Sequence, residues 1–227
     1  MELDTSIECV LFDLDGTLID TALDFIKALD RLTTENNQPP VEDFRVQQTV
    51  SDGARALIKL TFNIAENDDQ FAPLNQRLLD LYLEQLTDTE ATLYPGLPYL
   101  LAQLEEVGIP WGIVTNKPEK YSHQLLDKLN LLPRCGVLVC PDHVNERKPH
   151  PESIFLACDR LSCGTERTIF VGDHIRDIQA AKNADVIAVA AAYGYLPPEV
   201  KVEDWPADFI LRSSEQALPL LNSLKFA

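Results

Sequence analysis

The sequence VLFDLDGTLID, at positions 10–20, most constrains what this chain can fold into. Its apolar beginning predicts a short buried strand that ends in two carboxylates, Asp13 and Asp15, separated by one residue. Residues i and i+2 of an extended chain point to the same side, so these carboxylates are expected to converge on one small volume. Two carboxylates at such a short distance repel each other unless a cation or a shared proton lies between them. Hard oxygen ligands of this kind suit Mg2+. With Gly16 free to adopt a positive φ and turn the chain, the stretch predicts a cation site at the end of a strand.

Two other interpretations of the Asp-x-Asp-Gly pattern are an ordinary turn and a calcium loop. Asp and Gly are common turn residues, so the pattern also occurs without any function. A calcium loop of the EF-hand type needs further oxygen ligands and a Glu at the end of about 12 residues. A loop that starts at Asp13 ends at Asp24, and apolar residues such as Leu18 fall at or beside its ligand positions. The calcium loop is therefore set aside, and the choice between turn and site depends on the rest of the chain.

The charge of the chain argues against two classes of partner. The 227 residues include 36 acidic and 19 basic side chains, which gives a formal net charge of −17. Such a field repels nucleic acid and anionic membranes, so neither is expected as a partner. A phosphate site in this chain needs a metal, a lysine and backbone N–H groups to overcome the field locally. The oligomeric state stays open between monomer and dimer.

Three observations predict a cytoplasmic protein. No apolar run approaches the ~20 residues of a membrane span. The first residues, Met1-Glu2-Leu3-Asp4, are acidic, whereas a signal peptide starts with basic residues. The five cysteines are an odd number and contain no C-x-x-C pair, which favours reduced thiols.

The order of apolar and polar residues predicts an α/β chain that contains an all-helical block. From about Asp20 to Leu93 the apolar spacing is helical, and Ser51 is expected to cap a helix that runs through Thr61. After Tyr94-Pro95-Gly96, helices and strands alternate. Uniformly apolar strands that alternate with helices indicate a parallel sheet covered on both faces. The expected strands are 9–12, 109–114, 137–140, 168–171, 186–190 and 209–211.

Polar residues follow the predicted strands at one edge of this sheet. Sheets of this kind place their sites at the carboxyl ends of the strands. Each residue alone has an ordinary explanation, such as a helix N-cap for Asp173 or a solvated surface charge for Lys148. Four groups of compatible chemistry at one edge favour a functional site instead. These groups are Asp13/Asp15, Thr115/Asn116, Asp173/Asp177 and Lys148.

Together these groups can carry out phosphoryl transfer. Asp13 and Asp173 can hold Mg2+ between them, and Asp13 can attack phosphorus to form an aspartyl-phosphate. Mg2+ and Lys148 offset the repulsion between that carboxylate and an anionic phosphate. Thr115 and neighbouring backbone N–H groups can hold phosphoryl oxygens. Asp15 can protonate the leaving oxygen and then accept a proton from the water that cleaves the intermediate.

The chain resembles the haloacid dehalogenase-like hydrolases, because FDLDGTLIDT, VTNK, KPHPE and GDHIRD are similar to the four ordered motifs of that family. The resemblance covers essentially the whole chain. It implies a doubly wound, Rossmann-like core at residues 1–19 and 94–227, with a helical cap at 20–93 inserted between the first two motifs. The second Asp of the first motif is typical of phosphatases and mutases, which disfavours dehalogenation. His174 is a minor departure, since a small polar residue is common at that position.

The resemblance also implies a role for each motif residue. Asp13 is the expected nucleophile and Asp15 the expected acid/base. Mg2+ is the expected cofactor, held by Asp13, Asp173 and the backbone carbonyl of Asp15. Asp177, at the start of a helix, can orient metal-bound waters. Phosphate is expected to bind at Thr115, Asn116 and Lys148.

Similarities in WGIVTNKP, CPDHVNERKPHPE and AYGYLPPE are weaker and concern the substrate. They resemble the phosphoglycolate phosphatase group and, more closely, the N-acetylmuramic acid 6-phosphate phosphatases. The expected substrate is therefore a small phosphorylated metabolite, either N-acetylmuramic acid 6-phosphate or 2-phosphoglycolate. Both carry a carboxylate, which Arg55 near the start of a cap helix can pair with. The alternative for Arg55 is a side chain that lies along the helix surface.

Two other functions stay open at this stage. A phosphosugar mutase of the β-phosphoglucomutase type uses the same acid/base pair, but it must protect its aspartyl-phosphate from water. A catalytically silent binding protein on this fold is the second alternative. The intact set of Asp13, Asp15, Lys148 and Asp173 argues against silence.

Overall fold

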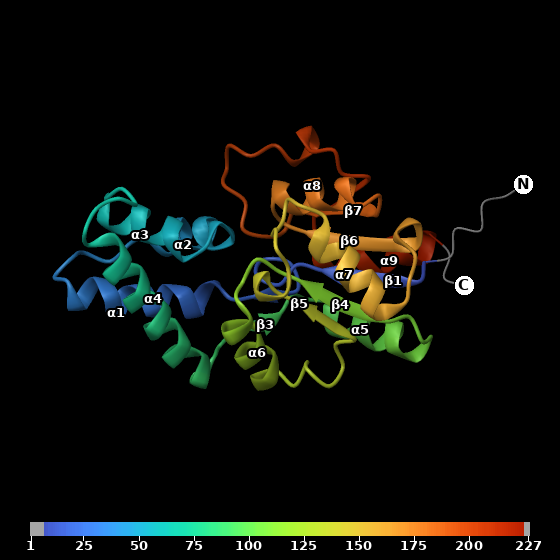
Figure 1. Ribbon diagram of the computed structural model, residues 1–227, viewed down its shortest axis with the longest axis horizontal. Helices are drawn as coiled ribbons and strands as arrows, with labels where there is room; N and C mark the ends of the chain where they lie inside the picture. The colour runs from blue at the N-terminus through green and yellow to red at the C-terminus, as the bar shows by residue number, and fades with distance from the viewer. Residues whose placement is uncertain (1–6, 225–227) are drawn as a thin grey trace, which may run out of the picture.

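A computed structural model describes residues 7–224 of the chain and contains a six-stranded sheet in the order β5-β4-β1-β6-β7-β8 (Figure 1). Every neighbouring pair is parallel. All six strands predicted from the sequence are present, and their ends differ by at most two residues from the expected ones. The bounds are β1 Cys9–Phe12, β4 Trp111–Val114, β5 Val137–Val139, β6 Thr168–Gly172, β7 Ile187–Ala191 and β8 Phe209–Leu211.

Helices cover both faces of the sheet, as the apolar strands predicted. In β1, Val10 and Phe12 belong to one hydrophobic cluster, and Cys9 and Leu11 belong to another on the opposite face. This alternation follows the two-residue period of a strand. The first cluster includes residues of α5 (Leu97–Glu106), α6 (Glu119–Lys128) and α9 (Ala217–Ser223). The second includes residues of α7 (Glu152–Leu161) and α8 (Ile175–Asn183), so the sheet is doubly wound.

Four helices form a separate unit at one end of the sheet, on the left of Figure 1. They are α1 (Ala22–Glu35), α2 (Asp43–Thr49), α3 (Ala54–Phe62) and α4 (Phe71–Gln85). The helix α1 packs along α4, and the rings of Phe25 and Tyr82 stack with centroids 4.0 Å apart. The predicted apolar faces therefore pack against each other, as the sequence indicated.

Two short strands connect the helical unit to the sheet. The strands β2 (Ile19–Asp20) and β3 (Thr92–Leu93) pair antiparallel at the two ends of the unit. The sequence analysis did not predict them, because two residues are too few to show the two-residue period of a strand. The chain thus passes from the sheet to the helical unit through β2 and returns through β3.

The expected role of Ser51 as a helix cap is wrong. A single 3-10 turn, Val50–Asp52, precedes α3, and the N-cap of α3 is Gly53 with φ +86°. This left-handed φ redirects the backbone, so Ser51 belongs to the preceding turn. The Ser51 hydroxyl instead donates a hydrogen bond to Oδ2 of Asp173, at 2.8 Å. The helical unit therefore touches the acidic edge of the sheet.

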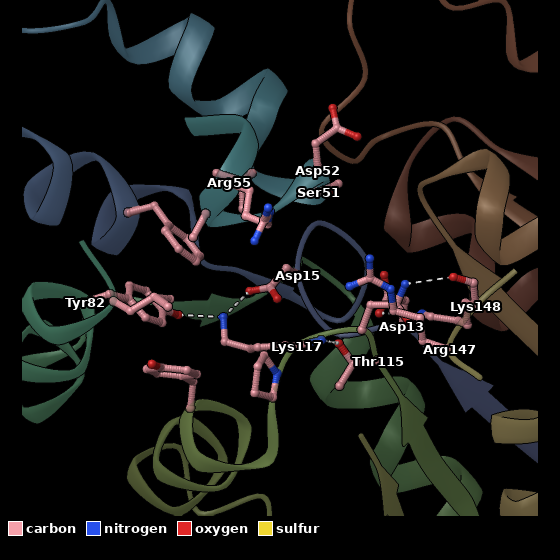
Figure 2. Close-up of a pocket in the computed structure, with 18 of the residues that line it drawn as sticks. Asp13, Asp15, Ser51, Asp52, Arg55, Tyr82, Thr115, Lys117, Arg147 and Lys148 are labelled. Atoms are coloured by element: carbon pink, nitrogen blue, oxygen red, sulfur yellow. Dashed lines mark hydrogen bonds and ion pairs between the residues drawn. The ribbon is translucent and has the colours of Figure 1, made fainter. Parts of the chain in front are cut away.

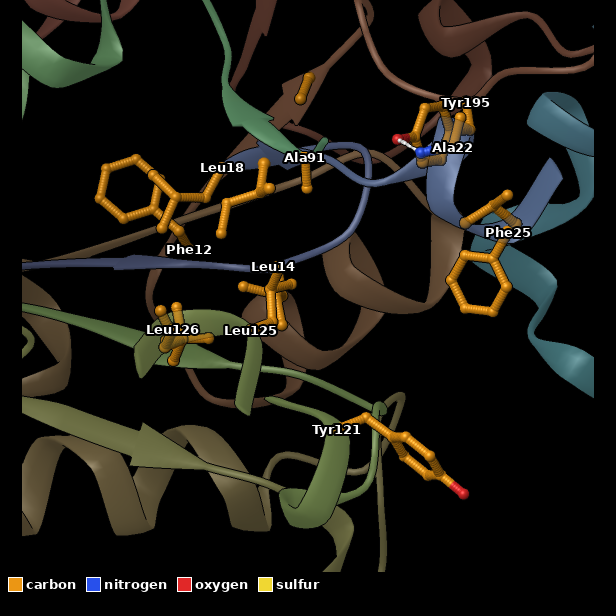
Figure 3. Packing of buried hydrophobic residues seen from close by; sticks show 14 of the residues in the cluster. Phe12, Leu14, Leu18, Ala22, Phe25, Ala91, Tyr121, Leu125, Leu126 and Tyr195 are labelled. Atoms are coloured by element: carbon orange, nitrogen blue, oxygen red, sulfur yellow. Dashed lines mark hydrogen bonds between the residues drawn. The ribbon is translucent and has the colours of Figure 1, made fainter. Parts of the chain in front are cut away.

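The loop after β1 is anchored by apolar residues on the side opposite its carboxylates. Leu14, between Asp13 and Asp15, is fully buried, and Figure 3 shows it directed toward Leu125 and Leu126 of α6.

All five cysteines are free thiols, as the sequence analysis expected. Within residues 7–224, no helix combines the length and the apolar character that a bilayer crossing needs.

Candidate active site

The sheet brings the predicted polar groups together at its carboxyl edge, where Figure 2 shows Asp13, Asp15, Thr115 and Lys148. β1 lies between β4 and β6, so Asp13, which follows β1, has Thr115 on one side and Asp173 on the other. Lys148 reaches the same place from the loop after β5. The crossover topology alone makes these sequence-distant residues neighbours, which is the arrangement expected of parallel sheets.

Lys148 is a buried cation between two carboxylates. Only 2% of its surface is exposed. Its Nζ lies 2.9 Å from Oδ1 of Asp13 and 2.8 Å from Oδ1 of Asp177. It also donates a hydrogen bond of 2.7 Å to the carbonyl oxygen of Val114, the last residue of β4. The interpretation of Lys148 as a solvated surface charge is therefore excluded.

Burial and the close charges shift the pKa values of the cluster. Burial raises the pKa of Asp13, an effect that the charge of Lys148 opposes without cancelling. Burial and then the charges of Asp13 and Asp177 raise the pKa of Asp173 to about 8. Burial lowers the pKa of Lys148, but the two carboxylates more than offset this, so its pKa is raised. The cluster therefore holds more negative charge than its one lysine neutralises.

Three buried carboxylates lie close enough to share a cation. One oxygen from each of Asp13, Asp173 and Asp177 lies within 4.8 Å of the other two. Oδ1 of Asp13 and Oδ1 of Asp177 lack a well-directed hydrogen bond, although both are at ion-pair distance from Lys148. Buried carboxylate oxygens that are not fully hydrogen-bonded are costly unless a charge compensates them. The donor set fits a hard divalent cation such as Mg2+.

Asp173 is held by backbone and side-chain donors from distant parts of the chain. Its Oδ2 accepts hydrogen bonds from the Tyr195 amide at 2.9 Å and from the Ser51 hydroxyl at 2.8 Å. Its Oδ1 accepts one from the Thr17 hydroxyl at 3.3 Å. Gly16 has φ +77°, and a Cβ there would collide with the Asp173 carboxylate. A glycine is therefore required by space as well as by backbone conformation.

The Asp15 carboxylate is held by residues other than those that hold Asp173. Its Oδ1 accepts a hydrogen bond from the Thr21 hydroxyl at 2.5 Å and one from Nζ of Lys117 at 2.8 Å. Both Asp13 and Asp15 line a pocket of about 300 Å3. The two carboxylates thus converge on one space, as the i and i+2 spacing predicted.

Thr115 and Asn116 organise the loops around the pocket. Oγ1 of Thr115 accepts a hydrogen bond from the Lys117 amide at 3.1 Å, which leaves the hydroxyl proton available to a ligand. Nδ2 of Asn116 donates to the carbonyl oxygen of Lys148 at 3.0 Å. Both residues line the pocket. Asn116 therefore ties the loop that follows β4 to the loop that carries Lys148.

The pocket lies between the sheet edge and the helical unit. Arg55 lines it from α3, and its guanidinium pairs with Glu66 and lies 5.2 Å from the ring centroid of Phe71. Arg176 of α8 closes the pocket on another side, because its Nη2 donates to the carbonyl oxygen of Ser51 at 2.7 Å. The pocket walls thus combine carboxylates of the sheet edge with cations from both parts of the protein.

Several pocket residues were not singled out from the sequence, among them Lys117, Arg147, Tyr82 and Arg176. Lys117 follows Thr115 and Asn116 in VTNK, and Arg147 precedes Lys148, so their position beside motif residues was the available signal. Tyr82 and Arg176 have no local signal. Tyr82 is one of several apolar-face residues of α4, and Arg176 is one of several charges on α8.

Comparisons with known proteins agree with this fold. Residues 10–191 match the haloacid dehalogenase-like hydrolase family. An N-acetylmuramic acid 6-phosphate phosphatase of Pseudomonas aeruginosa is 39% identical over 216 residues, which cover 95% of this chain and 95% of that protein. A phosphoglycolate phosphatase of Xanthomonas campestris is 37% identical over 210 residues, which cover 91% of this chain and 93% of that protein.

A solved structure shows the same fold over nearly the whole length. It is the crystal structure of a predicted phosphoglycolate phosphatase from Haemophilus somnus, with a TM-score of 0.84 and 24% identity. The superposition covers 96% of this chain and 99% of that chain. The sequence matches, the shared fold and the four motifs at one sheet edge all agree: the chain belongs to the haloacid dehalogenase-like hydrolase family.

Proposed function

We propose that this hydrolase is a Mg2+-dependent phosphatase that cleaves a small phosphomonoester through an aspartyl-phosphate at Asp13. The observation that carries the proposal is the buried Lys148 between Asp13 and Asp177, in the wall of a pocket that Asp13 and Asp15 also line. A carboxylate can attack an anionic phosphate only where positive charge is fixed beside it. Lys148 supplies such a charge, and the contacts with both carboxylates fix its position.

In the two half-reactions Asp13 is the nucleophile, and Asp15 acts first as the acid and then as the base. An Asp13 carboxylate oxygen bonds to phosphorus while the bond from phosphorus to the leaving oxygen breaks, and Asp15 gives its proton to that oxygen. A water oxygen then bonds to phosphorus, the bond to Asp13 breaks, and the water proton passes to Asp15. Thr115 and Lys148 hold the phosphoryl oxygens through the donors described above. Both aspartates return to their starting protonation states.

Asp13, Asp173 and the backbone carbonyl of Asp15 would hold the Mg2+ ion. When bound, the ion supplies positive charge that offsets repulsion between the nucleophile and the phosphate. Asp177 would hold Lys148 in place and orient water at the ion, because it contacts Lys148 and belongs to the same acidic cluster. The close-packed carboxylates support this assignment.

Residues 20–93 would act as a cap domain that selects the substrate. The helical unit contributes about half of the pocket wall, and Arg55, which lines it, would meet a second anionic group of the substrate. N-acetylmuramic acid 6-phosphate and 2-phosphoglycolate both have a carboxylate that can take this role. The names of the relatives from Pseudomonas aeruginosa and Xanthomonas campestris support the same two candidates.

Phosphate release in the presence of Mg2+ tests the proposal. The panel contains N-acetylmuramic acid 6-phosphate, 2-phosphoglycolate, β-glucose 1-phosphate and 4-nitrophenyl phosphate, with Asp13→Asn as the control. We expect release dominated by one of the first two substrates and abolished by the substitution. Isomerisation of the sugar phosphate without net release would indicate a mutase. No reaction with any substrate would indicate a silent binding protein.

A further inference from the structure

Lys117 is a buried cation that the mechanism above does not use. Only 8% of its surface is exposed. Its Nζ lies 2.8 Å from Oδ1 of Asp15 and 2.7 Å from the hydroxyl of Tyr82, and Figure 2 shows both contacts. The same Nζ lies 4.8 Å from the ring centroid of Phe25 and 4.5 Å from that of Tyr82. Lys117 belongs to the sheet part of the protein, whereas both aromatic residues belong to the helical unit.

These partners are the ones that a desolvated ammonium group needs. A buried lysine is costly unless its charge is paired and its N–H groups are hydrogen-bonded. Asp15 supplies the opposite charge, Tyr82 accepts a second hydrogen bond, and the two aromatic faces stabilise the charge on the remaining side. Within residues 7–224, Asp15 is the only carboxylate at ion-pair distance from Lys117. The position of this lysine is therefore coupled to one catalytic side chain.

The hydrogen bonds on Asp15 distinguish its two oxygens. Oδ1 accepts from both Lys117 and the Thr21 hydroxyl, and in the described part of the chain no hydrogen bond reaches Oδ2. An oxygen that already accepts two hydrogen bonds does not carry the proton of a carboxylic acid. The acid form of Asp15 therefore has its proton on Oδ2. Since Asp15 lines the pocket, that oxygen is the one available to a substrate.

We propose that Lys117 is a positioning residue that fixes Oδ1 of Asp15, so that the proton leaves and returns through Oδ2. The inference rests on the proposed function. In the first half-reaction the Oδ2 proton moves to the leaving oxygen as the bond between that oxygen and phosphorus breaks. In the second, a proton of the attacking water moves to Oδ2. Tyr82 reaches Lys117 only when the helical unit packs against the sheet as it does here.

A series of aryl phosphates tests this role through the pKa of the leaving group. The rate constant kcat/KM includes only the steps up to phosphorylation of Asp13, so it reports proton donation to the leaving oxygen and not the later attack of water. A good leaving group such as 4-nitrophenolate departs without a proton, whereas phenolate depends on one. We expect Lys117→Met to lower kcat/KM by about 100-fold with phenyl phosphate and by less than about 3-fold with 4-nitrophenyl phosphate.

Three further variants make the result decisive. Asp15→Asn removes the acid, so kcat/KM of this variant should depend on the leaving-group pKa in the same way as kcat/KM of Lys117→Met. Tyr82→Phe keeps the aromatic ring and loses one hydrogen bond to Lys117, so a smaller change in the same direction is expected, and this variant carries the test if Lys117→Met does not fold. Lys120 is an exposed lysine in the same segment, and Lys120→Met should leave kcat/KM unchanged for both substrates.

Two outcomes would contradict the proposals separately. If Lys117→Met lowers kcat/KM by the same factor with every leaving group, or has no effect, Lys117 does not position the acid, while the phosphatase function stands. If the unmodified protein releases no phosphate from any aryl ester or from either carboxylated substrate, the proposed function itself fails.

Discussion

Replacing Lys148 with Met should strongly destabilise the protein when no metal is present. The substitution removes the buried ammonium that lies 2.9 Å from Asp13 and 2.8 Å from Asp177, and it leaves both carboxylates without their cation. It also leaves the carbonyl oxygen of Val114 without its donor. Met has a similar length and no charge, so the change is mainly electrostatic.

The expected loss follows from the burial of the pair. Removing one partner of a buried ion pair costs about 3–5 kcal/mol, because an uncompensated charge stays inside the protein. For a chain of this size each kcal/mol lowers Tm by about 2–4 °C, so a decrease of about 6–20 °C is expected. Lys182→Met is the matched control, since Lys182 pairs with Asp208 at the surface at 2.8 Å. An exposed pair contributes about 1 kcal/mol or less.

Thermal unfolding with EDTA and with saturating Mg2+ measures the effect. Mg2+ should restore part of the lost Tm of Lys148→Met, because it returns positive charge to Asp13 and its neighbours. Adding Asp177→Asn to Lys148→Met should also restore stability, since it removes one of the two uncompensated carboxylates. The reasoning is refuted if Lys148→Met loses no more stability than Lys182→Met, or if Mg2+ stabilises both variants equally.

Two further predictions concern the metal and the cap. In the metal-free folded protein the pKa of Asp173 is raised from 3.8 to about 8. Between these two pH values the folded protein keeps a proton on Asp173, whereas the unfolded chain has lost it. Its Tm should therefore fall as the pH rises through that range, and the Tm increase caused by Mg2+ should be larger at about pH 8 than at about pH 6 in differential scanning calorimetry; an increase that shrinks with pH would contradict this. Arg55→Ala should raise KM about 10-fold or more for the preferred carboxylated substrate and leave 4-nitrophenyl phosphate unaffected in steady-state assays. Lys59→Ala, which also removes a partner of Glu66, is the control, and an equal effect of both variants would show that Arg55 acts only through Glu66.

The sheet and the position of the acidic edge could be predicted because their signals are local. Each strand is an apolar run, and the polar groups that include Asp13, Thr115 and Asp173 stand directly after such runs. Parallel topology then brings them together without any knowledge of packing. The helical unit was equally visible, because the apolar faces of α1 and α4 show a clear helical period.

Contacts between the helical unit and the sheet could not be predicted. Ser51 reaches Asp173, and Tyr82 reaches Lys117, only because the two parts pack in one particular orientation. Local sequence describes Ser51 as a helix cap and Tyr82 as one apolar residue among several. The burial of Lys148 likewise depends on the loop after β5 folding over β4, which Asn116 secures.

The most direct test of the central claim is mass spectrometry of the protein quenched in acid during turnover of 4-nitrophenyl phosphate with Mg2+. Asp15→Asn is the best variant for trapping, because the good leaving group permits phosphorylation while cleavage of the intermediate is slow without the base. The account predicts one phosphoryl group on the peptide that contains Asp13, and none in Asp13→Asn. Phosphate release without a phosphoryl group on Asp13, or release that survives Asp13→Asn, would contradict it.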